Sequence, residues 1–147
     1  MTFELKVAID NIMKLYLYAD VCKMIHYTTE KMHEHKLADD VRDSIMKFAD
    51  ELAEQTFGYS GKPKLSDFSL KHNLIVCTNI SQLCQTVLKI VQDLRKEYEK
   101  DNMYGVVSII DDFIGELSQY VYLGQFDNIS NDKINEVLTK VITKYIK

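Results

Sequence analysis

The sequence contains few residues that interrupt helices. Only one of its 147 residues is Pro, only five are Gly, and it has no Trp. Because a fold of many short strands needs frequent turn residues, this scarcity disfavours an all-β protein and favours long helices. A chain of this length with 46% hydrophobic residues is expected to form one domain, residues 1–147, with its own core.

A long apolar run and a basic segment are also missing. No stretch approaches the ~20 apolar residues that a membrane span requires, and no charged, apolar leader opens the chain. The 18 basic residues are spread among 22 acidic ones, for a net charge of −4, which argues against nucleic acid as a partner. We therefore expect a cytoplasmic protein that binds neither membrane nor DNA.

The three cysteines lack the pattern of a zinc site or a disulfide. The chain has an odd number of cysteines, namely Cys22, Cys77 and Cys84. They show no CxxC spacing and fall inside apolar helical patterns. Buried free thiols are therefore expected.

Apolar residues do recur at intervals of three and four, the spacing of amphipathic helices. This spacing predicts helices over about residues 4–25, 30–57, 74–100, 103–123 and 131–146. Gly58 and Gly124 are expected to end the second and fourth of them. Segment 58–73 contains the only Pro, two Gly and several Ser, which predicts a long crossover connection.

Four long helices with one long crossover predict an all-α, ferritin-like four-helix bundle over about residues 4–124. The connection at 58–73 is long enough to run from one end of such a bundle to the other. The helix at about 131–146 is an addition to this bundle.

Histidines and carboxylates gather at helical spacing in segment 26–58. His35 and Asp39, here called the histidine half-site, lie four residues apart and share one helical face. Asp50 and Glu54, the carboxylate half-site, repeat this spacing further along. At ~100° per residue all four fall on one stripe of the second helix, turned away from the core. The half-sites lie about 16 Å apart along the axis, so they cannot share one metal within one chain.

The chain also lacks the residues for a self-contained two-metal bundle. Such a bundle takes a Glu-x-x-His motif from each of two helices, and the sequence offers the motif once, at residues 30–33. No histidine follows His72. Both half-sites must therefore be completed from elsewhere.

The stripe has two interpretations. Charged residues on an outward helix face are usually solvated. Met46, in the middle of the acidic face, and Ala38, Ala49 and Ala53 beside it suggest instead that another helix covers the face.

A second copy packed antiparallel across this face would bring each histidine half-site opposite a carboxylate half-site, twice. The two-fold axis would then cross the second helix near residues 44–45. Arg42, Asp43 and Met46 would lie around that axis.

The other histidines have separate expectations. On a continuous helix, His26 would point about 180° away from His35, so it reaches the site only if the chain bends between them. The sequence leaves open whether it bends near residues 28–29. His33 is expected at the surface or as a capping residue, and His72 in the crossover as structural or exposed.

The segment ADELAEQTFG, residues 49–58, resembles the Asp-x-x-Ala-Glu stretch and following loop glycine of the miniferritins, the Dps-like proteins. The spacing of the two half-sites is similar to theirs. HYTT at 26–29 and EHK at 34–36 resemble more closely a ferritin-like group of bacteriophages and gut Bacteroidetes. The resemblance covers about residues 10–123, and its specific motif lies within 26–58.

The resemblance implies a ferroxidase centre shared by two subunits. Its ligands would be His26, His35 and Asp39 of one subunit with Asp50 and Glu54 of its two-fold mate. Fe(II) would be oxidised there by peroxide or oxygen, and the Fe(III) product would be stored in a hollow, dodecameric shell. Independently of the resemblance, imidazole and carboxylate ligands with open positions suit iron or manganese better than structural zinc.

The expected function is therefore iron oxidation and sequestration by a homo-oligomer. The alternative is a metal-free or metal-stabilised ferritin-like structural protein, such as a phage component, that uses the same face for assembly. The opening MTFELK has a single lysine and does not resemble the lysine-rich tail by which some Dps-like proteins hold DNA. DNA is therefore not expected as a partner.

Overall fold

The structure, a computed structural model, describes residues 2–126 and 131–145. Its elements are α1 (Leu5–Thr28), α2 (Met32–Ser60), a 3-10 turn η1 (Leu65–Asp67), α3 (Ile80–Glu99), α4 (Tyr104–Leu123) and α5 (Asn131–Tyr145). No strand occurs in the described residues, so the all-α prediction is confirmed. None of the helices described is both long enough and apolar enough to cross a membrane.

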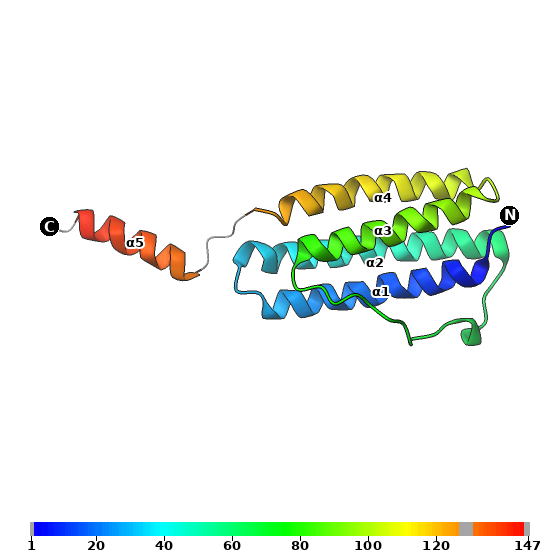
Figure 1. Cartoon of the computed structure of the whole chain (residues 1–147), viewed down its shortest axis with the longest axis horizontal. Helices are drawn as coiled ribbons and strands as arrows, with labels where there is room; N and C mark the ends of the chain where they lie inside the picture. The colour runs from blue at the N-terminus through cyan, green and yellow to red at the C-terminus, as the bar shows by residue number, and fades with distance from the viewer. Residues whose placement is uncertain (1, 127–130, 146–147) are drawn as a thin grey trace.

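Helices α1 to α4 lie side by side in a bundle-like arrangement (Figure 1). α1 and α2 form one antiparallel pair, and α3 and α4 form another. Segment 61–79 carries the chain along α1 from the end of α2 back to the start of α3, as the crossover prediction required. The connection from α1 to α2, the start of α3 and the end of α4 therefore lie at the same end of the α1–α4 arrangement.

The four helices share one apolar core. The rings of Phe48 on α2 and Phe113 on α4 stack with their centroids 4.0 Å apart. The hydroxyl oxygens of Thr56 on α2 and Tyr98 on α3 lie 2.6 Å apart, which satisfies both polar groups inside the core. Burial of each large apolar side chain stabilises this packing by roughly 1.5–3 kcal/mol.

Helix α3 begins later than predicted. Residues 74–79 are non-helical, although apolar spacing placed them in a helix. Asn79 has extended backbone angles, and its side chain accepts a hydrogen bond of 2.8 Å from the Gln82 N–H, which caps the helix. Leu74 and Cys77 still pack against the core, from the end of the crossover. The prediction was wrong here because apolar spacing alone does not show where a helix starts.

Helix α2 also passes its predicted end. Gly58 lies inside the helix, and Gly61 ends it with a φ of +95°. Glycine tolerates this angle because it has no Cβ. The Gly61 N–H donates to the Phe57 carbonyl at 2.8 Å. The end of α4 at Gly124 is as predicted.

The three cysteines are free and buried, as predicted. Burial raises the pKa of Cys84 to about 12, with a smaller contribution from Cys77. Burial likewise raises the pKa of Cys22 above its ordinary value. The thiols of Cys22 and Cys84 therefore stay protonated and unreactive at neutral pH.

Helix α5 follows the prediction of a fifth helix, except that residue 146 lies outside the described residues. Its side chains from 136 to 145 are all exposed. Figure 1 draws it apart from α1 to α4. The candidate site described below lies entirely on α1 and α2.

The cap of α3 can be tested by substitution. Asn79→Ala should lower the free energy of unfolding by about 1 kcal/mol, since the Gln82 N–H loses its acceptor. Urea denaturation followed by circular dichroism measures this difference. Asn73→Ala, at an exposed crossover position, is the control and should leave the midpoint unchanged. Equal midpoints for both variants would contradict the cap.

Candidate functional site

The chain turns back sharply between α1 and α2, so the bend that the sequence left open does occur. Only residues 29–31 separate the two helices. The Thr29 hydroxyl donates to a Glu34 carboxylate oxygen at 2.7 Å. The other Glu34 oxygen accepts from the Ile80 N–H at 3.2 Å. Glu34 therefore ties the bend to the start of α3.

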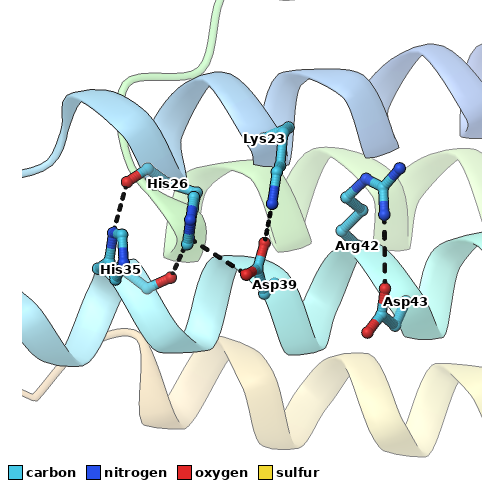
Figure 2. Close-up of polar contacts among 6 residues, drawn as sticks. All are labelled: Lys23, His26, His35, Asp39, Arg42 and Asp43. Carbon is cyan, nitrogen blue, oxygen red and sulfur yellow. Dashed lines mark hydrogen bonds and ion pairs between the residues drawn. The ribbon is translucent and has the colours of Figure 1, made fainter.

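The bend places His26 directly against His35 (Figure 2). The two rings stack with centroids 3.7 Å apart and an interplanar angle of 20°. Nδ1 of His26 lies 2.6 Å from the His35 carbonyl oxygen, and Nδ1 of His35 lies 2.7 Å from the His26 carbonyl oxygen. Because a carbonyl oxygen only accepts, each Nδ1 carries the proton and donates. Each histidine side chain is thus hydrogen-bonded to the backbone of the other.

This pairing selects the imidazole tautomer in which Nε2 is the acceptor. A neutral imidazole has one N–H and one lone pair, so a proton on Nδ1 leaves the lone pair on Nε2. Among the described residues, neither Nε2 atom of His26 and His35 has a hydrogen bond or an ion pair. Metal-binding histidines are commonly held this way, with the other ring nitrogen bonded to a carbonyl.

Asp39 lies beside this histidine pair. One of its oxygens is 3.4 Å from Nδ1 of His26, and the other accepts from the Lys23 ammonium at 3.0 Å. The hydrogen bond from Lys23 lowers the pKa of Asp39, as does the charge of His26, and these outweigh an opposing effect of desolvation. Asp39 therefore remains a carboxylate as the pH falls into the ordinary aspartate range.

The carboxylate half-site lies further along α2. Asp50 and Glu54 are exposed, and neither makes a hydrogen bond or an ion pair in the part of the chain described. Burial raises the pKa of Tyr16 on α1, and the charges of both carboxylates add to this rise. The eleven residues from Asp39 to Asp50 still separate the half-sites by about 16 Å.

One chain alone does not assemble the predicted ligands. Within residues 2–126 and 131–145, no group of three or more His, Cys, Asp or Glu residues is arranged to hold a metal ion. The structure brings together His26, His35 and Asp39, and it keeps Asp50 and Glu54 apart from them.

The small residues on α2 do not form an outward face. Ala38 and Ala49 are fully buried within the core, and Met46 packs against it, so this part of the sequence interpretation was wrong. The buried positions of α2 centre about 60° from Leu37, which marks the edge of the core stripe rather than its middle. The histidine half-site therefore lies on the flank beside α1 and is half-buried, whereas the carboxylate half-site is exposed.

The residues expected near a dimer axis lie on different sides of α2. Arg42 is half-buried, and its Nη1 lies 3.6 Å from an Asp43 oxygen (Figure 2). Its Nε is buried and has no hydrogen-bond partner among the described residues. Asp43 lines a pocket between α2 and α4, together with Asp112 and Glu116. The interface role of Arg42, Asp43 and Met46 stays a prediction.

The remaining two histidines match their expectations. His33 is exposed, and its Nε2 lies 3.0 Å from the carbonyl oxygen of Leu123, the last residue of α4. His72 is half-buried in the crossover, with its Nε2 2.8 Å from the Ser69 carbonyl oxygen. Both contact a backbone carbonyl through Nε2, whereas His26 and His35 do so through Nδ1.

The sequence interpretation missed Lys23. This lysine precedes His26 by three residues and so shares a face of α1 with it. Its ammonium lies 5.3 Å from the centre of the Tyr27 ring as well as against Asp39. The spacing from Lys23 to His26 was visible in the sequence, but the contact with Asp39 requires the bend.

The tautomers can be measured directly. At a pH where the imidazoles are neutral, long-range ¹H–¹⁵N NMR spectra should show the Nδ1–H tautomer for His26 and His35, because both donate from Nδ1 to carbonyls. His33 and His72 are internal controls that should show the Nε2–H tautomer. An Nε2–H tautomer at His26 or His35 would rule out the reciprocal pair.

The chain was also compared with known proteins. No protein-family model matches it, no curated protein matches it, and no solved structure matches it. Its chemistry must therefore be inferred from its own residues.

Proposed function

We propose that this chain is a Dps-like ferroxidase, which binds Fe(II) at sites shared between two copies and oxidises it. The main support is the reciprocal histidine pair. His26 and His35 are held through Nδ1, and both Nε2 lone pairs are unengaged among the described residues, while an Asp39 carboxylate oxygen lies 3.4 Å from Nδ1 of His26. Pre-positioned imidazole nitrogens next to a carboxylate suit Fe(II), and Mn(II) accepts the same donors.

A second copy is needed because the remaining donors lie too far along α2. An antiparallel pair of chains related by a two-fold axis would bring the carboxylate half-site of one to the histidine half-site of the other, twice. Each site would then hold two imidazoles and three carboxylates. The exposure of Asp50 and Glu54 supports such pairing, since both remain available to a partner.

The arrangement of α1 to α4 also supports the proposal. A ferritin-like four-helix bundle contains two antiparallel helix pairs joined by one long crossover, and α1 to α4 with segment 61–79 offer these parts. By resemblance to the miniferritins, the dimers would assemble further into a hollow, dodecameric shell that stores the oxidised iron.

The donor set fits the chemistry. Two Fe(II) ions give one electron each to one hydrogen peroxide molecule, which takes up two protons and leaves as two water molecules. Iron gains one unit of positive charge on oxidation, and the carboxylates of Asp39, Asp50 and Glu54 offset that charge. The imidazoles supply neutral nitrogen ligands.

The alternative function is a metal-free assembly protein. The ion pair between Lys23 and Asp39 favours it, because an ammonium neutralises this carboxylate without a metal. In that case the face of α2 would only join copies of the chain.

Removal of the carboxylate half-site separates the two functions. The double variant Asp50→Ala plus Glu54→Ala should oxidise Fe(II) at least about tenfold more slowly than the wild type, because each site loses two of its charged ligands. The increase in Fe(III) absorbance after addition of peroxide measures the rate. Asp40→Ala plus Glu51→Ala removes two exposed carboxylates elsewhere on α2 and should leave the rate unchanged. Equal rates in all three proteins would reject the enzyme and leave the assembly protein.

Sharing of sites between copies has its own test. The variant His35→Ala plus Asp39→Ala lacks the histidine half-site, and Asp50→Ala plus Glu54→Ala lacks the carboxylate half-site. Each should be inactive alone. Unfolded together in equal amounts and refolded, they should recover about a quarter of the wild-type activity, since half of the dimers are mixed and each mixed dimer has one intact site. Failure to recover activity in mixtures shown to contain mixed dimers would exclude shared sites.

A further inference from the structure

We propose that Lys23 is a built-in counter-ion of the histidine half-site, which a divalent metal must displace from Asp39 in order to bind. This inference rests on the proposed function, because it concerns the same site. It makes Lys23 a positioning residue that sets the affinity for metal.

The contacts of Asp39 are the first support. Its two oxygens face two different groups, the Lys23 ammonium at 3.0 Å and Nδ1 of His26 at 3.4 Å (Figure 2). Lys23 comes from α1 and Asp39 from α2, so the ion pair also bridges the two helices. A metal that used the Asp39 oxygen now bonded to Lys23 would occupy the position of the ammonium.

Charge makes the two occupants exclusive. An ammonium and a divalent cation on the same carboxylate oxygen would lie within about 4 Å of each other, where like charges repel strongly. The metal therefore gains the carboxylate only when the ammonium leaves. Each binding event exchanges one ion pair for one metal–carboxylate bond.

The position of Lys23 allows this exchange. Its side chain is 35% exposed, and its four-carbon stem has enough rotatable bonds to carry the ammonium into water. Tyr27 is 72% exposed, and its ring, 5.3 Å from the ammonium, offers a second, weaker contact. The Lys23 ammonium can therefore leave Asp39 and does not block the site permanently.

The ion pair also explains how the site can exist without metal. Asp39 has an ammonium partner, whereas Asp50 and Glu54 have no ion-pair partner among the described residues. The two half-sites would therefore differ in how readily they bind a metal. The carboxylate half-site is available to a metal at once, and the histidine half-site becomes available after Lys23 moves.

Metal titration of charge-matched variants tests the inference. Mn²⁺ serves as the probe, since it takes the same ligands, and its binding is followed by isothermal titration calorimetry without any oxidation. Lys23→Met keeps the apolar stem and removes the ammonium, so it should bind Mn²⁺ about fivefold more tightly than the wild type, the size of effect that an exposed ion pair can produce. Lys36→Met is the control, because it removes an exposed lysine next to His35 that makes no ion pair in the described structure. It should change the affinity less than about twofold.

The outcomes separate this inference from the proposed function. If the wild type binds Mn²⁺ and Lys23→Met binds it equally or more weakly, the counter-ion role is overturned and the proposed function stands. If Lys36→Met gains as much affinity as Lys23→Met, net charge explains the gain and the inference also fails. If neither the wild type nor Lys23→Met binds Mn²⁺, both the inference and the proposed function fail. Lys23→Gln repeats the titration if the methionine variant does not fold by circular dichroism.

Discussion

The reciprocal hydrogen bonds between His26 and His35 are the contact on which the candidate site depends. The last carbonyls of a helix lack partners within it, and His35 supplies one to the last turn of α1 by donating to the His26 carbonyl. His26 makes the corresponding bond to α2. The two helix ends are thereby joined by the same imidazoles that could bind metal. Nδ1 of both side chains thus serves the fold, and in the proposed function Nε2 would bind the metal.

Electrostatics divides the acidic stripe of α2 into two different parts. Near the bend, Asp39 is bonded to Lys23, and its negative charge is offset within the chain. About three to four turns later, Asp50 and Glu54 are exposed without an ion-pair partner in the described residues. The proposed pairing of two copies would use this asymmetry, because each part would offer what the other lacks.

The errors of the sequence interpretation share one physical origin. Apolar spacing shows that a helix has a buried face, but it does not give the centre of that face or the residue at which the helix starts. Ala38 and Ala49 thus seemed to flank an outward acidic face, whereas α2 buries them in the core. Residues 74–79 have helical spacing, yet the Asn79 side chain binds the Gln82 N–H and begins α3 later. Tertiary contacts decide whether a small residue is buried and whether a polar side chain caps a helix.

The sequence alone determined the all-α class, four of the five helices to within a few residues at each end, the crossover, the buried thiols and the common stripe of His35, Asp39, Asp50 and Glu54. These follow from local periodicity, which each helix expresses by itself. The distance between the two half-sites also follows from the rise of one helix. Only the tertiary structure decided that His26 joins His35, that Lys23 neutralises Asp39 and that the histidine half-site lies against α1. Those contacts join residues of two helices, and their geometry depends on a bend of three residues whose direction no periodic pattern encodes.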